Sequence, residues 1–362
     1  MDVKKLLEKY KDELTVIGKA KMPKNMPWPP MPIRNTPITA RDNYLQMARG
    51  EKPMFMPVDL DEMMFSPKIF PDAIARGFIV DNNEQKIEEL GGKDMFGVEW
   101  IYMPETGGSM VRPGNPVVTD ITKWEEVVTF PDISKWDWEG SGKLNADLMS
   151  KDFAQNIWIM NGIFERLISL MDFEAAAVAL IDEDQQASVH GFFEKLVSLY
   201  EEMLDYIDHY YDIDVLYFHD DWGSQRAPFF SADTCREMIA PYLKRVVECA
   251  HSHNMLFNFH SCGCIAELVP VMIECGVDIW CGQPMNAFEK IYDAYGDRIR
   301  LGIYYEPPGV GAPLEEVVAS CKNFIERYSK NGYGFPVIYA EEYSADFYDV
   351  MYALSREYYQ NH

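Results

Sequence analysis

A histidine and a cysteine two residues apart, His260 and Cys262, are the side chains whose types and spacing point most directly to chemistry. An imidazole and a thiolate at the end of one strand can reach the same zinc ion, and zinc accepts both kinds of ligand. A catalytic zinc site needs about three protein ligands and an open position. The last predicted strand end offers Glu341 or Glu342 as the third ligand, and Cys264 and Cys281 are rival candidates. The alternative interpretation of the pair is a packed core histidine beside an inert cysteine.

Polar residues follow several other strand-like segments of the sequence. The carboxylates of Asp220 and Asp221 could act as a base, bind a cationic group or ligate a metal. The alternative is a turn in which one of them caps the next segment. The strand ends give these candidate catalytic residues: His219, Asp220, Asp221, Tyr305 and Glu306. The candidates for binding a substrate are Met56, Asp59, Asn161, Phe164 and Gln283.

The elements that must position these residues are short apolar runs that alternate with amphipathic helices. Runs without polar alternation are buried on both faces, which is typical of a parallel sheet. The predicted strands are 55–60, 156–161, 213–219, 255–260, 277–281, 299–305 and 335–340. The predicted helices between and after them lie near 233–252, 264–275, 286–295, 313–330 and 345–359.

No GxGxxG follows any of these runs, so a dinucleotide-binding sheet is disfavoured. With one weaker strand elsewhere, the count predicts an eight-stranded (β/α)₈ TIM barrel. We expect residues 1–38 to form a helical and proline-rich extension and residues 39–362 to form a single barrel domain. In such a barrel the chemistry lies at the carboxyl ends of the strands.

Composition limits the classes of partner. The 362 residues carry a formal net charge of −25, so nucleic acid and anionic membranes would be repelled. We expect no transmembrane segment and no signal peptide, because no long uncharged apolar run is present and the first residues are charged. The seven cysteines are odd in number and contain no CxxC, which favours a reduced, cytoplasmic protein.

Several segments resemble the uroporphyrinogen decarboxylase superfamily, whose fold is a (β/α)₈ barrel. The segments that carry the resemblance are HDDWGSQ (219–225), HSCG (260–263), ECGVD (274–278), NGIFERLISLM (161–171) and TARDNYLQMARGEKPMFMPV (39–58). The decarboxylases of the superfamily carry an arginine-containing segment after the first strand, to hold substrate carboxylates. This chain has VDLDEMMF (58–65) at that place, which disfavours the decarboxylase activity.

The other branch of the superfamily consists of corrinoid-dependent methyltransferases, many of which hold zinc with His-x-Cys and a later Cys. His260 and Cys262 match the first two positions, and Glu341–Glu342 stand near the place of the later Cys. The resemblance is closest to the methyltransferase I component of anaerobic O-demethylases. It implies zinc, cobalamin presented by a separate corrinoid protein, and a methoxylated aromatic as the methyl donor.

Three alternatives stay open at this stage. The first is methyl transfer from methylcobalamin to tetrahydrofolate or a thiol, the second is a decarboxylase-like activity, and the third is a barrel that only binds a ligand. The oligomeric state is also open, with a homodimer as one option.

Overall fold

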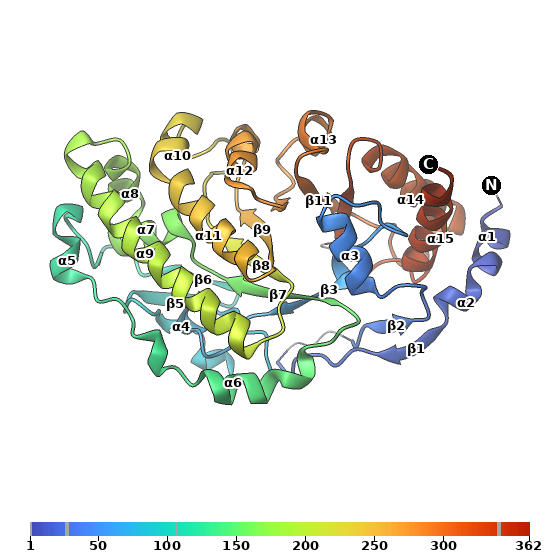
Figure 1. Cartoon of the computed structure of the whole chain (residues 1–362), viewed down its shortest axis with the longest axis horizontal. Helices are drawn as coiled ribbons and strands as arrows, with labels where there is room; N and C mark the ends of the chain where they lie inside the picture. The colour runs from blue at the N-terminus through green and yellow to red at the C-terminus, as the bar shows by residue number, and fades with distance from the viewer. Residues whose placement is uncertain (1, 26–28, 106, 339–341) are drawn as a thin grey trace.

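A curled parallel sheet of seven strands forms the centre of the protein (Figure 1). The computed structural model describes residues 2–25, 29–105, 107–338 and 342–362. The strands lie side by side in the order β12 (Gly334–Ile338), β11 (Arg300–Tyr305), β10 (Ile279–Gly282), β9 (Leu256–Ser261), β8 (Val215–His219), β7 (Ala154–Ile159) and β3 (Glu62–Phe65). Because all neighbours are parallel, every carboxyl end meets at the same edge of the sheet.

Six of the predicted strands are confirmed, with bounds shifted by a few residues. Their side chains are buried on both faces, as continuous apolar runs require. In the last of the six, the predicted residues 339 and 340 lie outside the described part of the chain.

The strand predicted at 55–60 is wrong, and the first strand of the sheet is β3 instead. The side chain of Asn43 binds the backbone of Met54 and Phe55, and Ser355 Oγ accepts the N–H of Met56 at 2.8 Å. The backbone groups that a strand would give to its neighbours are therefore held by side chains. Residues Asp59–Asp61 form a single 3₁₀ turn that leads into β3.

The sheet has seven strands in the described residues, one fewer than the predicted barrel. The two edge strands β12 and β3 share no ladder. They are joined through the turn before β3, where the backbone N–H of Ile338 donates to Asp59 Oδ2 at 2.8 Å. The sheet curls far enough to enclose an interior, but the described strands do not complete an eight-stranded barrel.

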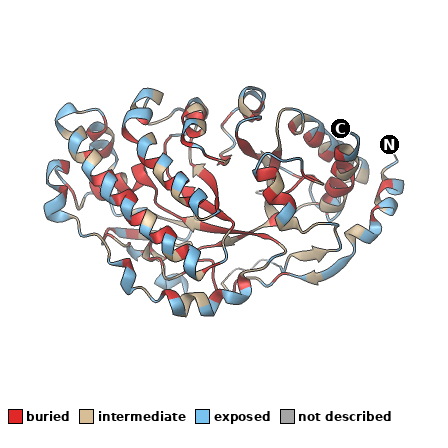
Figure 2. Ribbon diagram, in the orientation of Figure 1, coloured by how far each residue is buried: buried red, intermediate tan, exposed pale blue. Residues whose placement is uncertain are grey.

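Helices cover the outer face of the sheet, some packing directly on it and others on neighbouring helices, and they bury their apolar sides (Figure 2). Their bounds are α3 (Ala40–Ala48), α4 (Pro71–Ala75), α5 (Trp124–Val127), α6 (Trp138–Asn145), α7 (Ile163–Met171), α8 (Phe173–Ala179), α9 (Glu183–Tyr210), α10 (Ala232–Met238), α11 (Ala240–Ser252), α12 (Val269–Cys275), α13 (Phe288–Tyr295), α14 (Leu314–Tyr328) and α15 (Phe347–Asn361). The helix predicted at 233–252 is divided into α10 and α11, and Pro241 stands in the first turn of α11, where a missing N–H is tolerated. In the described part of the chain, no helix is both long and apolar enough to cross a membrane.

The N-terminal extension folds back on the end of the chain. It contains α1 (Val3–Lys9), α2 (Lys11–Leu14) and a two-stranded sheet of β1 (Val16–Lys19) and β2 (Pro32–Arg34). The ring of Tyr10 packs edge-on against Tyr352 of α15 at 6.2 Å, so both ends of the chain lie together (Figure 1). A separate antiparallel sheet of β4 (Gly92–Lys93), β5 (Glu99–Met103) and β6 (Gly108–Val111) follows α4.

Candidate metal centre

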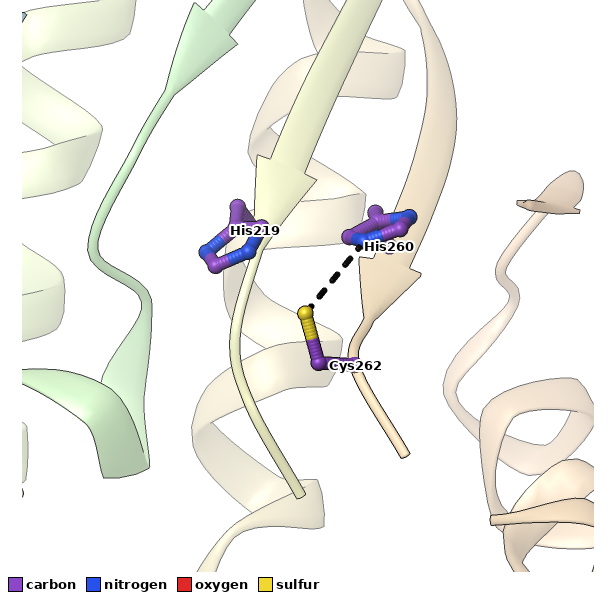
Figure 3. Close-up of side chains that lie close together, drawn as sticks. All are labelled: His219, His260 and Cys262. Atoms are coloured by element: carbon purple, nitrogen blue, oxygen red, sulfur yellow. Dashed lines mark hydrogen bonds between the residues drawn. The ribbon is translucent and has the colours of Figure 1, made fainter. Parts of the chain in front are cut away.

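The carboxyl ends of β8 and β9 bring three metal-capable side chains together (Figure 3). His219 is the last residue of β8 and pairs in register with His260 of β9. Their rings lie face to face, with centroids 5.2 Å apart. Cys262 follows β9 directly and turns its sulfur toward both rings.

The three side chains fit a zinc ion by chemistry and by spacing. Their ligand atoms all lie within 4.8 Å of one another, and His260 Nε2 is 3.9 Å from Cys262 Sγ. Zn–N bonds of about 2.0 Å and Zn–S bonds of about 2.3 Å hold tetrahedral ligands about 3.6 Å apart. Small side-chain adjustments would therefore place His219, His260 and Cys262 around one ion.

Hydrogen bonds at the far side of each ring set which nitrogen is free. His260 Nδ1 donates to the carbonyl of Cys281 at 2.7 Å. His219 Nδ1 donates to Glu165 Oε2 at 2.7 Å and lies 3.1 Å from the carbonyl of Met160. Carbonyl and ionised carboxylate oxygens only accept, so both protons reside on Nδ1. The Nε2 atoms then face the cluster, which is the orientation that metal-binding histidines adopt.

The electrostatic environment differs between the two histidines. Burial opposes a positive charge on His219, but the carboxylates of Glu165 and Asp221 outweigh it and raise the pKa well above its usual value. Burial and the neighbouring charge of His219 lower the pKa of His260 to about 4. Burial raises the pKa of the Cys262 thiol, although His219 partly offsets this effect.

The two adjacent aspartates have separate tasks. Asp220 is fully buried and accepts hydrogen bonds from the backbone N–H groups of Phe164 and Glu165, at 3.2 and 2.7 Å. It therefore caps the start of α7 and points away from the cluster. Asp221 lies at the cluster, with Oδ1 3.4 Å from His219 Nε2 and 2.8 Å from the backbone nitrogen of Cys262.

Two glycines allow the loops after β8 and β9 to touch. A Cβ atom on Gly263 would lie 2.3 Å from the backbone of Gly223, and Gly263 has a φ of +93°. Side chains at these positions would push the loops apart. The close approach is what holds Asp221 against Cys262.

Two charged residues of the site were not predicted from the sequence. Glu165 of α7 orients His219 and forms an ion pair with Arg76, which follows α4. Both side chains are largely buried, and Arg76 Nη1 also lies 3.3 Å from Asn161 Oδ1. The sequence signal was available in IFERLISLM, where Glu165 and Arg166 interrupt a buried apolar helix. A charge there requires a buried partner.

The predicted catalytic residues on β11 lie away from this cluster. The hydroxyl of Tyr305 bonds Ser320 Oγ of α14 at 2.6 Å, so its side chain occupies the outer face of the sheet. Glu306 is exposed and accepts a hydrogen bond from the Tyr304 hydroxyl at 2.6 Å. Gln283 contributes to the loop of the site, because its Oε1 accepts the N–H of Gly263 at 2.8 Å.

The predicted substrate residues are distributed between the core and the interior of the sheet. Met56 is buried against Tyr359 of α15, and Phe164 is buried within α7, so neither reaches the cluster. Asn161 belongs to the buried polar network around Arg76. Asp59 lies at the turn before β3, where it holds β12.

Of the two predicted glutamate ligands, Glu342 alone belongs to the described part of the chain. Glu342 is exposed, and no metal-capable group in the described residues includes it. Glu341 lies outside the described residues. The third side chain beside His260 and Cys262 is His219, which the sequence had suggested as a catalytic residue.

Comparison with solved structures supports the fold. A methyltransferase from Methanosarcina mazei is similar over 89% of this chain and 99% of its own, with a TM-score of 0.58 and 17% identity. A xylanase from Gloeophyllum trabeum is similar over 61% of this chain and 81% of its own, with a TM-score of 0.35 and 10% identity. No protein-family model matches the sequence, and a search of the curated proteins finds no match. At 17% identity, the similarity to the methyltransferase shows a shared fold.

Proposed function

We propose that the protein is a methyltransferase that moves a methyl group from a methoxylated aromatic to cob(I)alamin on a partner corrinoid protein. The observation that carries the proposal is the convergence of His219, His260 and Cys262 at the carboxyl ends of β8 and β9. These three residues would hold zinc. Bound zinc would supply a Lewis acid for an ether oxygen, whose phenolate is otherwise a poor leaving group.

The chain itself supplies orientation and proton control. Glu165 and the Cys281 carbonyl fix the two imidazole rings from behind, so the site is formed before a ligand enters. Arg76 pairs with Glu165 and keeps that carboxylate from carrying an unpaired buried charge. Asp221, beside His219 Nε2, is placed to hold or accept a proton at the open side of the cluster.

Access to the cluster supports the same function. Met64, Trp158, His260 and Val337 occupy inward positions of their strands and are all partly exposed, so solvent reaches the interior of the sheet. The fold is similar to that of a methyltransferase. The chain has no DxHxxG motif, which is why we assign the corrinoid to a separate protein.

Metal analysis of purified protein tests the metal centre. Zinc should be near stoichiometric in the wild type and lost in Cys262→Ser. Cys264→Ser is the matched control, because Cys264 is on the same loop but outside the cluster. Wild-type protein that is fully active without metal would refute the zinc site and leave protonated His219 as the acid for the ether oxygen.

The absorption bands of cobalt test the methyl transfer. A partner corrinoid protein in the cob(I)alamin state should become methylcobalamin when the enzyme and a methoxylated aromatic are added. Loss of methylcobalamin on addition of tetrahydrofolate or a thiol would instead support the reverse direction. No spectral change with any donor or acceptor would refute methyl transfer.

A further inference from the structure

Polar side chains occupy the interior of the curled sheet below the metal cluster. Apolar branched residues usually fill this layer of a barrel. Here the inward positions of the strands include Glu62 of β3, Asn156 of β7 and Asn258 of β9. Asn258 pairs in register with Tyr217 and precedes His260 by two residues, so it faces the same side of the sheet as both.

Two carboxylates in this interior have no cationic partner among the described residues. Glu62 Oε2 accepts a hydrogen bond from Asn156 Nδ2 at 2.8 Å, and Asp59 Oδ2 accepts the backbone N–H of Ile338. Burial raises the pKa of Asp59 to about 8 and the pKa of Glu62 to about 7. The charges of Glu62 and Asp61 add to the effect of burial on Asp59, and no salt bridge to either Asp59 or Glu62 is present among the described residues.

Unsatisfied polar atoms around these carboxylates are an independent sign of a ligand. Asn258 is fully buried, and neither its Nδ2 nor its Oδ1 has a hydrogen-bond partner. The buried Oδ1 of Asn156, on the same face of the sheet, also lacks a partner, whereas the hydroxyl of Tyr44 interacts with Glu62. The thiol of Cys281 connects the group, because it lies near Asn258, Glu62 and Asp59. Buried polar groups without partners are rare and costly, so their clustering indicates that something binds there.

Stacked aromatic rings lie between this interior and the metal cluster. The rings of Trp158 and Tyr217 are stacked with centroids 3.8 Å apart, and Tyr217 lies 5.7 Å from the ring of His260. A metal ion fits this interior less well, because no group of three metal-capable side chains in the described residues includes Asp59 or Glu62.

We propose that the interior binds an ammonium group, and that the methyl donor is therefore a methoxylated aromatic amine. The identity of the donor rests on the proposed function, whereas the ammonium site does not. An ammonium group offers hydrogen-bond donors to Glu62, Asp59 and Asn258 Oδ1, and it supplies the positive charge that the carboxylates lack. The aromatic ring of the donor then spans the layer of Tyr217, with its methoxy group at the metal cluster.

Three ligands that differ in charge test the proposal. They are para-methoxyphenethylamine, which is a cation, para-methoxyphenethyl alcohol, which is neutral, and para-methoxyphenylacetate, which is an anion. Titration calorimetry on the full-length protein should show the amine binding about tenfold or more tightly than the alcohol, and the acetate binding weakest. Equal affinity for amine and alcohol, tighter binding of the acetate, or no binding of the amine would overturn the proposal.

Substitutions locate the binding and separate it from the metal centre. Glu62→Gln keeps the size of the side chain and should remove the preference for the amine, and Asp59→Asn should reduce it. Glu88→Gln, at an exposed position, should leave the preference unchanged. Thermal melting should show Glu62→Gln at least as stable as the wild type, because an uncompensated buried charge is removed.

The same titration in Cys262→Ser distinguishes this proposal from the function proposed above. The preference for the amine should persist in that variant even when metal and turnover are lost. A preference that survives Glu62→Gln in a folded protein would place the ammonium site elsewhere and refute the assignment.

Discussion

Zinc binding to the metal-free protein should release two protons near pH 7. The elevated pKa of His219 keeps its imidazole protonated in the metal-free state, and the raised pKa of Cys262 keeps its thiol protonated. His260, with a pKa lowered to about 4, is already neutral. Zinc binds thiolate and neutral imidazole only, so it must displace one proton from His219 Nε2 and one from Cys262 Sγ.

The two displaced protons set the size of the pH effect. Apparent zinc affinity should rise by about 100-fold for each pH unit, since each displaced proton contributes about tenfold. The direction of this pH dependence follows from the raised pKa values of His219 and Cys262. Both groups have a pKa above the working pH, so lowering the pH adds competing protons and weakens binding. The steep dependence should extend from just above the pKa of His260 up to the lower of the raised pKa values of His219 and Cys262.

Calorimetric titration with zinc in buffers of different protonation enthalpy measures the number of protons. The slope of the observed enthalpy against buffer enthalpy should give two for wild type and for Cys264→Ser, whereas Cys262→Ser should show no heat of zinc binding. Release of a single proton by the wild type would mean that His219 remains an imidazolium and is not a ligand. Release of none would exclude Cys262 as well.

Three further substitutions separate residues that hold the fold from residues that orient the site. Asp220→Ala should lower the free energy of unfolding by about 2–3 kcal/mol, because the amides at the start of α7 lose their acceptor; an unchanged urea midpoint would contradict the capping role. Tyr305→Phe should cost about 1 kcal/mol in the same titration through loss of the bond to Ser320, with metal content and turnover unchanged; lost turnover at normal stability would return this tyrosine to the site. Glu165→Gln should lower the pKa of His219, measured by NMR of the imidazole protons, and weaken zinc binding by about 10–100-fold; an unmoved pKa would show that Glu165 does not control the ring.

The sheet was largely predictable because the signal for a parallel strand is local. A continuous apolar run in the sequence indicates a strand that is buried on both faces, as in β8 and β9. The run at 55–60 was equally apolar but is not a strand, because Asn43, which precedes it in the chain, and Ser355, which lies far away in the sequence, bind its backbone. No local pattern reports on a partner that arrives from almost 300 residues away.

The site was predictable only where its residues share one strand. The spacing of His260 and Cys262 in the sequence indicates that they can bind one ion. The position of His219 beside them depends on the register between β8 and β9. The two adjacent aspartates could not be distinguished in the sequence. The direction of the chain after β8 places the side chain of Asp220 at the start of α7 and that of Asp221 at the cluster. Register and chain direction are properties of the folded sheet, so spacing alone could not assign them.

The charge balance of the site explains how metal-free and metal-bound states can both be stable. Without metal, the positive charges of protonated His219 and Arg76 match the negative charges of Glu165 and Asp221. Exchange of two protons for one divalent zinc ion leaves that total unchanged, so no other buried group has to titrate when the metal binds. A monovalent ion or a trivalent ion would leave an uncompensated charge in the same low-dielectric environment. The charges of Glu165, Arg76 and Asp221 around His219 therefore favour a divalent metal, in addition to the ligand atoms themselves.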